Sequence, residues 1–229
     1  MQANPDLYFR QIPLGPMANF IYLIGSRSKG ECMVVDPAWD TEALIDAAGK
    51  DGMKITGALV THYHPDHCGG SIFGFNVPGG VAELIGKVDA RIHVHKLEAD
   101  GLKVVTGVSD SDMVRHESGD KIAIGDVTVE LLHTPGHTPG SQCFMVNERL
   151  VAGDTLFVGG CGRVDLPGSD PDEMYASMMR LAELPDHIEL YPGHDYGASK
   201  SAKMGEQKMS NAYLRKRTLE QWRGMMGKR

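Results

Sequence analysis

The feature that most constrains this chain is the run of histidines and one aspartate at residues 62–67, spaced H-x-H-x-D-H. An apolar run at 55–60 precedes it, and Pro65, Gly69 and Gly70 interrupt the chain within and just after it, which is typical of a strand that enters a loop. Imidazole suits zinc, iron and similar ions, while a carboxylate can bind or bridge them. We therefore interpret the run as part of a metal site. The alternative is a histidine-rich surface loop.

Three later residues of ligand type supply the ligands that the first run lacks. His137, Asp154 and His194 each follow an apolar run and lie beside a glycine, so each is predicted to stand at a strand end. Strand ends that carry ligands indicate one edge of a sheet that gathers a site. The candidate metal ligands are His62, His64, Asp66, His67, His137, Asp154 and His194.

The overall composition favours one globular domain. The chain has 229 residues, 41% of them hydrophobic, which is enough for a substantial core in a single domain over 1–229. The formal charge is −7, but the segment 198–229 is basic and is predicted to be helical. We expect this segment either to contact an anion or acidic partner, or to be an amphipathic helix with a solvated face. The acidic remainder argues against nucleic-acid binding.

The cysteines and the apolar runs indicate a reducing compartment. Cys32, Cys68, Cys143 and Cys161 form no C-x-x-C pair, and no secretory leader or membrane-spanning run is visible, so we expect a cytoplasmic protein without a membrane partner. Cys68 adjoins the histidine run, so it is either a soft ligand or a small packed residue. Cys161 is either redox-active or packed in a glycine-rich loop.

The order of predicted elements begins β-β-β-α-β, with strands over 7–14, 19–25 and 31–36, a helix over 41–50 and a strand over 55–60. Further along we expect helices over 79–88, 96–102, 171–184 and 199–223, strands over 91–95, 121–124, 126–132, 142–146, 149–152 and 188–191, and loops over 104–113 and 157–168. The helix over 199–223 is expected to be broken near Gly205 and Asn211.

Two further groups of residues have open interpretations. The insertion 72–88 includes Phe73, and Phe75 comes two positions later; this pair is predicted either to line a substrate entrance or to pack under a long loop. His93 and His95 share a strand face, and we interpret both as structural because seven better placed ligands are available. His116 is predicted to be exposed in a polar turn.

The combined ligand set resembles the metallo-β-lactamase superfamily over nearly the whole chain. The resemblance implies an α/β (α+β) fold, an αβ/βα sandwich of two mixed β-sheets flanked by helices, with the metal site at one edge. It further implies that His62, His64 and His137 hold one divalent ion, that Asp66, His67 and His194 hold the second, and that Asp154 bridges them.

The motifs at 153–157, 160–163 and 191–196 resemble the glyoxalase II and persulfide dioxygenase branch more closely. Glyoxalase II hydrolyses the thioester of hydroxyacylglutathione, and two ions roughly 3.5–4 Å apart can share the attacking hydroxide. Asp66 and Asp154 are then the catalytic carboxylates, with Asp66 also a candidate general base. Zinc, or a zinc/iron mixture, is the expected cofactor. We favour this hydrolase, acting on a small glutathione-derived molecule, because all seven ligands are present.

The alternative is a persulfide dioxygenase with one Fe(II). The resemblance then maps the iron ligands onto His62, His137 and Asp154, a set that leaves positions open for O₂. Asp165 and the Asp195–Tyr196 pair resemble the dioxygenases, and only 35 residues come after His194, too few for the helical domain of glyoxalase II. A non-enzymatic metal-binding module is a remote alternative.

Residues beyond the ligands complete the predicted site. Arg163 is predicted to grip a substrate carboxylate, since guanidinium binds carboxylate bidentately, or else to pair with Asp165. Asp165 and Tyr196 are further candidate substrate contacts. Asp36 and Asp195 are predicted to orient ligands from behind, although Asp36 is equally interpretable as a turn cap. The oligomeric state stays open, with a homo-oligomer among the alternatives.

Overall fold

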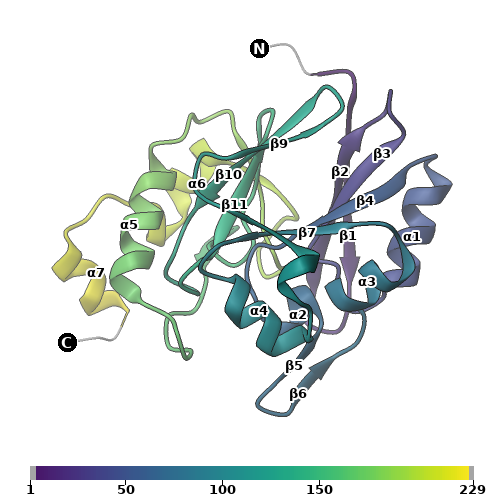
Figure 1. Cartoon of the computed structure of the whole chain (residues 1–229). Coiled ribbons are helices and arrows are strands. Elements are labelled where there is room, and N and C mark those ends of the chain that lie inside the picture. The colour runs from purple at the N-terminus through teal and green to yellow at the C-terminus, as the bar shows by residue number, and fades with distance from the viewer. Residues whose placement is uncertain (1–3, 227–229) are drawn as a thin grey trace.

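The first of two facing sheets is built from the N-terminal half of the chain. A computed structural model describes residues 4–226 (Figure 1). Strands β1 to β3 pair antiparallel, whereas β3, β4, β7 and β8 pair parallel, so the sheet is mixed. In spatial order its strands are β1 (Leu7–Leu14), β2 (Asn19–Ser26), β3 (Glu31–Val35), β4 (Lys54–Leu59), β7 (Arg91–His95) and β8 (Met113–His116).

The second sheet is built from the C-terminal half and is also mixed, because β12 and β15 pair parallel while the other neighbours pair antiparallel. In spatial order its strands are β16 (Ala202–Lys203), β15 (Glu189–Tyr191), β12 (Arg149–Val151), β11 (Gln142–Val146), β10 (Val127–His133) and β9 (Lys121–Ile124).

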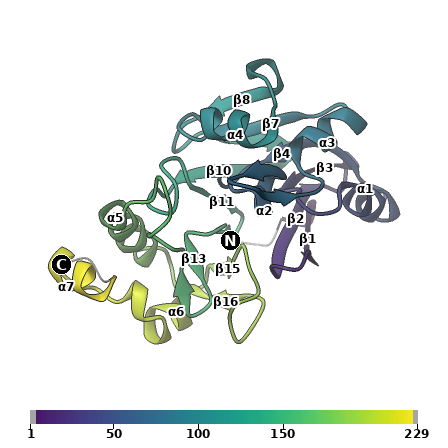
Figure 2. The same cartoon turned by 90° about the horizontal axis from the view of Figure 1, so that it is seen from below.

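Helices cover the outer faces of both sheets. Helices α1 (Thr41–Lys50), α3 (Val81–Lys87) and α4 (Ala99–Thr106) pack on the first sheet. Helices α5 (Pro171–Ala182), α6 (Met204–Ser210) and α7 (Leu219–Met225) pack on the second. Figures 1 and 2 show α1 and α3 on one side of the molecule and α5 and α7 on the other. The predicted αβ/βα sandwich is therefore confirmed.

Strand β2 is buried on both faces, which explains why its sequence is apolar without alternation. All eight of its residues are buried. Phe20, Tyr22 and Ile24 face the second sheet, and Ile21 and Leu23 face the helices α1 and α3. A strand covered on both faces reads as a continuous apolar run. The same double coverage fixes the position of the loops at the strand ends, where the site lies.

The expected break near Asn211 is present, but the predicted helical start at 199 was wrong. In place of a helix over 199–223, the chain forms β16, then α6, a 3₁₀ turn at Ala212–Leu214 and α7. Asn211 separates α6 from the turn because its amide donates to the carbonyls of Phe157 and Gly160, at 3.1 and 3.0 Å. These tertiary bonds outweigh the local helical preference. Helix α4 also extends four residues beyond its predicted end at 102.

Basic side chains of the segment 198–229 meet acidic groups of the same chain. The described ion pairs include Lys208 with Asp186 at 2.7 Å, Lys216 with Glu183 at 3.0 Å and Arg223 with Asp172 at 2.9 Å. Trp222 is fully buried, and its indole N–H donates to the Pro171 carbonyl. Within residues 4–226, no helix has the length and apolar character that crossing a membrane requires.

Two short hairpins occupy segments predicted as loops or insertions. Strands β5 (Gly70–Ile72) and β6 (Phe75–Val77) form a hairpin directly after the histidine run. Strands β13 (Leu156–Phe157) and β14 (Gly160–Cys161) form another inside the predicted loop 157–168.

Candidate metal centre

The histidine run comes after β4 and turns into the four-residue helix α2 (Pro65–Cys68). Pro65 occupies the first helical position, where its lack of an N–H is tolerated, and His64 is the N-cap residue. This tight turn points His62, His64, Asp66 and His67 into one region. Loops that extend from strands of the second sheet bring His137, Asp154 and His194 to the same edge.

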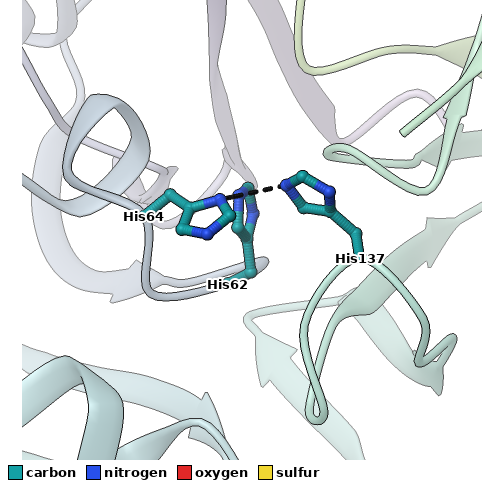
Figure 3. Close-up of side chains that lie close together, drawn as sticks. All are labelled: His62, His64 and His137. Atoms are coloured by element: carbon teal, nitrogen blue, oxygen red, sulfur yellow. Dashed lines mark hydrogen bonds between the residues drawn. The ribbon is translucent and has the colours of Figure 1, made fainter. Parts of the chain in front are cut away.

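The first group consists of His62, His64 and His137, whose rings point toward one another (Figure 3). His64 Nδ1 lies 3.1 Å from His62 Nε2 and 3.0 Å from His137 Nε2. Metal–nitrogen bonds of about 2.0–2.1 Å in a tetrahedral site place ligand atoms at such separations. The three nitrogens therefore have the spacing of one face of a coordination shell.

The second group consists of Asp66, His67 and His194. His67 Nε2 lies 3.1 Å from His194 Nε2, and Asp66 Oδ2 lies 3.3 Å from each of these nitrogens. Asp154 stands between the two groups: its Oδ1 lies 3.3 Å from His67 Nε2, and its Oδ2 lies 3.7 Å from His137 Nε2. One carboxylate thus reaches ligand atoms of both groups.

Hydrogen bonds on the far side of the rings fix how the imidazoles present their lone pairs. His137 Nδ1 donates to the Arg163 carbonyl at 2.8 Å, and His194 Nδ1 donates to the Met17 carbonyl at 2.9 Å. His67 Nδ1 donates to Asp36 Oδ2 at 2.9 Å. Each of these rings therefore turns its Nε2 toward the centre, which is the usual arrangement of histidines that bind metal.

The pKa values divide the histidines into two classes. Burial and the neighbouring histidines lower the pKa of His64 to about 4 and that of His62 well below its usual value. Burial also opposes protonation of His194, but the Asp154 and Asp66 carboxylates outweigh it and raise the pKa to about 9. Burial alone would raise the pKa of Asp154, yet His67 and His194 hold it well below the ordinary range.

These residues fit a cation. Asp154 Oδ1 is buried and accepts no hydrogen bond from the described residues. The Nε2 atoms of His67 and His194 face each other while both rings donate through Nδ1, so their contact requires positive charge, from a proton or from a metal ion. A divalent ion supplies that charge and satisfies the carboxylates. Neutral imidazoles with carboxylates suit zinc and iron. The centre is therefore built for divalent metal.

Comparison with known proteins identifies the family of this chain. The metallo-beta-lactamase superfamily model matches residues 14–194. The chain belongs to the metallo-β-lactamase superfamily. It is 40% identical to a hydroxyacylglutathione hydrolase of Rhodopseudomonas palustris over 184 residues, which is 79% of this chain and 64% of that protein. The chain thus spans less than two thirds of this relative.

Two solved structures of the superfamily are similar over most of the chain. ETHE1 from Myxococcus xanthus has a TM-score of 0.82 and 25% identity, covering 96% of this chain and 90% of that one. TTHA1623 in a di-iron-bound form has a TM-score of 0.74 and 27% identity, covering 90% of this chain and 100% of that one. These relatives confirm that the chain lies in the glyoxalase II and persulfide dioxygenase-like branch of the superfamily.

Asp36, predicted to orient a ligand, has three hydrogen-bond partners. Besides His67 Nδ1, its carboxylate accepts the Thr61 N–H at 2.8 Å and the Thr61 hydroxyl at 2.6 Å. Asp36 is buried and has φ 54°, a conformation that residues other than glycine seldom adopt. Backbone strain of this kind persists where surrounding contacts fix the conformation. Here those contacts hold a buried carboxylate behind the metal ligands.

Asp195 does not have the contact predicted for it. Its side chain is exposed, and its backbone N–H donates to the Ala18 carbonyl at 2.8 Å. His194 is oriented instead by the Met17 carbonyl. Tyr196 stacks on the His194 ring, with centroids 4.5 Å apart, and is 59% exposed, so it stands at the rim of the centre.

Arg163 and Asp165 pair with each other in a bidentate bond, with both nitrogen–oxygen distances 2.9 Å. This ion pair is one of the two roles predicted for Arg163 from the sequence. Both side chains are about two thirds exposed, so either can exchange this partner for another. The Arg163 backbone also serves the centre, since its carbonyl orients His137.

The two candidate cysteines are packed. Cys68 Sγ donates to the Tyr63 carbonyl at 3.1 Å, on the inner side of α2, and burial raises its pKa well above the usual value. Burial raises the pKa of Cys161 to about 12, so its thiol is protonated and weakly reactive.

Four of the five histidines outside the centre form two pairs. His95 stacks on His133 with centroids 4.0 Å apart. His93 Nδ1 lies 2.9 Å from His116 Nε2. The prediction for His116 was wrong, because it belongs to strand β8, where its side chain is only 12% exposed. The β7–β8 register places His116 opposite His95, and its ring reaches along the strand to His93.

Sequence reasoning missed two residues that hold the loops. Asn19 donates to the Asp66 backbone carbonyl and, at 3.2 Å, to Asp66 Oδ2, while Trp39 donates to the Asn19 carbonyl oxygen. Glu98 is fully buried and accepts from Tyr63 N–H at 2.8 Å and from Gly140 N–H at 2.6 Å. Glu98 therefore ties the histidine run to the loop of His137. The sequence around Glu98, K-L-E-A-D-G, is largely polar and gives no signal of this burial.

Proposed function

We propose that this chain is a metal-dependent hydrolase that binds two divalent ions and cleaves a thioester such as that of hydroxyacylglutathione. The observation that carries the proposal is the assembly of both ligand groups around Asp154. Its Oδ2 lies 3.7 Å from His137 Nε2 of the first group and 3.4 Å from His194 Nε2 of the second, and its Oδ1 lies 3.3 Å from His67 Nε2. The relative at 40% identity is named a hydroxyacylglutathione hydrolase, and this supports the choice of substrate class.

His62, His64 and His137 would hold one ion, and Asp66, His67 and His194 the other, with Asp154 shared. When bound, such a pair of ions supplies Lewis acidity and lowers the pKa of water toward about 7. Zinc is the proposed metal because imidazole and carboxylate groups predominate. In the net reaction water adds to the thioester carbonyl, the carbon–sulfur bond breaks, and a carboxylic acid and a thiol leave.

Protein groups behind the proposed metal ligands hold those ligands in place. Met17, Asp36 and the Arg163 carbonyl fix three imidazoles, so little reorganisation is needed when substrate arrives. Asp66 is ionised, because its pKa lies below the ordinary range through His67 and His194 although burial would raise it. So low a pKa makes Asp66 a good ligand and a weak general base.

A second candidate is a persulfide dioxygenase with one iron held by His62, His137 and Asp154. The observation that favours it is the likeness to ETHE1, of which the chain covers 90%, against 64% of the hydroxyacylglutathione hydrolase. The two candidates differ in metal count, because the dioxygenase assignment leaves His64 and His194 without a metal.

Metal content and oxygen uptake separate the candidates. We expect protein purified without added metal to hold about two ions per chain and to hydrolyse hydroxyacylglutathione without consuming oxygen. His64→Ala should lose both metal and turnover, whereas His187→Ala, which alters a histidine paired with Glu148 outside the centre, should retain both. One iron per chain, retained in His64→Ala, with stoichiometric oxygen uptake on glutathione persulfide would overturn the hydrolase assignment.

A further inference from the structure

The β5–β6 hairpin carries two aromatic side chains that the core does not bury. Phe73 is 88% exposed and Phe75 is 42% exposed. The hairpin rises directly after the ligand helix α2, and in Figure 1 it extends away from both sheets. An exposed large apolar side chain adds nothing to folding stability. Two such side chains beside a metal centre therefore indicate a role other than stability.

The hairpin tip is also an unfavourable place for phenylalanine. Phe73 and Gly74 connect the paired residues Ile72 and Phe75, and their φ values are 48° and 82°. Positive φ at both central residues is the requirement of a type I′ turn, for which Asn-Gly is the preferred pair. A bulky side chain at the first position is strained. Strained residues gather at ligand clamps, where function compensates for them.

A cavity of about 400 Å³ lies between this hairpin and the loop 166–168. His64 and Asp66, both predicted ligands, belong to its wall, so the cavity opens onto the metal centre. The rest of its wall is mostly apolar and includes Tyr63, Ile72, Phe73, Phe75 and Leu166. At the roughly 30 Å³ that a water molecule occupies in the liquid, the volume holds about a dozen non-hydrogen atoms.

The lining excludes the charged part of a glutathione thioester. Among residues 4–226, no lysine or arginine lines the cavity, and its only acidic group is Asp66. The carboxylates of a glutathionyl group would lose hydration here without gaining a cation. An uncharged, apolar group has no such penalty and gains from contact with the two phenylalanines.

We propose that this cavity takes the acyl group of the substrate, and that Phe73 and Phe75 select an aromatic or branched apolar acyl group over a small hydroxyacyl group. This inference rests on the proposed thioester hydrolysis. It assigns the β5–β6 hairpin as the element that determines specificity, with the thiol portion of the substrate outside the cavity.

The substitution Phe73→Asn tests the hairpin, because it creates the preferred Asn-Gly pair while removing the aromatic wall. We expect the melting temperature to rise by about 2–4 °C through relief of strain. We expect kcat/KM for S-phenylacetylglutathione to fall about tenfold more than kcat/KM for S-lactoylglutathione, equivalent to about 1.4 kcal/mol. The wild type should prefer the phenylacetyl substrate.

Met209→Asn is the matched control, since Met209 is 73% exposed on α6 and does not line the cavity. It should change neither substrate ratio nor turnover. An equal fall of kcat/KM for both thioesters in Phe73→Asn, or a wild type that prefers the lactoyl substrate, would overturn the inference.

Ligand binding separates this inference from the proposed function. If the wild type hydrolyses no thioester, the proposed function fails, and calorimetry of the metal-loaded protein then tests the cavity alone. Phenylacetate should bind at least tenfold more tightly than acetate, and Phe73→Asn should abolish the difference. Equal binding of the two carboxylates to the wild type would refute an apolar acyl site.

Discussion

Substituting Glu98 by glutamine should change how stability depends on pH. Burial raises the pKa of this carboxyl to about 7, although Thr138 and the N–H groups of Gly140 and Tyr63 oppose the shift. In the unfolded chain the value returns to about 4.5. Between these values the folded state holds a proton that the unfolded state has released. Stability is therefore complete below about pH 4.5 and is lost as the pH rises toward 7.

The size of this loss can be worked out from the two pKa values. Raising a carboxyl pKa from 4.5 to about 7 corresponds to roughly 3 kcal/mol of unfolding free energy. Glutamine does not titrate, so Glu98→Gln lacks the loss. The substitution also places an amide opposite the Tyr63 N–H. This effect is the same at every pH, so it shifts the unfolding free energy equally across the whole pH range.

Urea unfolding of metal-free protein at pH 4.5 and pH 8 measures the difference. Comparing the variant with the wild type at each pH cancels the histidines and other carboxylates. We expect the stability of Glu98→Gln relative to wild type to improve by about 3 kcal/mol from the lower pH to the higher. Glu31→Gln, an exposed residue on β3, is the control and should behave as the wild type does. Parallel pH curves for Glu98→Gln and wild type would refute the reasoning.

Three further outcomes test the centre. Asp36→Ala should weaken zinc binding by about 10–100-fold, measured by competition with a chelator, because His67 loses its partner; unchanged affinity would contradict this. Gly193→Ala should lower metal content with an unchanged circular dichroism spectrum, since a Cβ would lie 2.5 Å from Asp154 Oδ1; full metal content would show that the carboxylate adapts. Arg163→Ala should raise KM for a glutathione thioester more than it lowers kcat, and an unchanged KM would restrict Arg163 to its ion pair.

The sequence predicted the ligands because their signals are local. The run 62–67 and the residues His137, Asp154 and His194 each come after an apolar segment and lie in a turn, and the structure brings all of them to one edge. Where strands of two sheets end at the same edge, residues far apart in sequence converge. Local patterns are enough to place such residues, because each pattern marks a strand end.

Residues whose role depends on distant partners were not predictable in this way. Glu98 contacts groups 35 to 42 positions away, so its neighbours in sequence suggested only a helix. The contact of His116 with His93 depends on the pairing of β8 with β7, whereas the local sequence around His116 indicated only a polar turn. The sequence predicts a break near Asn211 but not its cause, a pair of hydrogen bonds to residues 51 and 54 positions earlier.

The division of ligands between the two halves of the sandwich has a consequence for assembly. The first four ligands come after β4 in the N-terminal sheet, whereas His137, Asp154 and His194 come after strands of the C-terminal sheet. The ligands of the N-terminal and C-terminal halves lie far apart in sequence, so bringing them together is slow. Neither half of the chain can enclose an ion alone. Metal capture should therefore be a late event of folding, and bound metal would then join the two sheets as a covalent cross-link would. A nascent chain released before Gly193 is synthesised would carry an incomplete centre, and chelation of the finished protein should loosen the sheets from each other first at this edge.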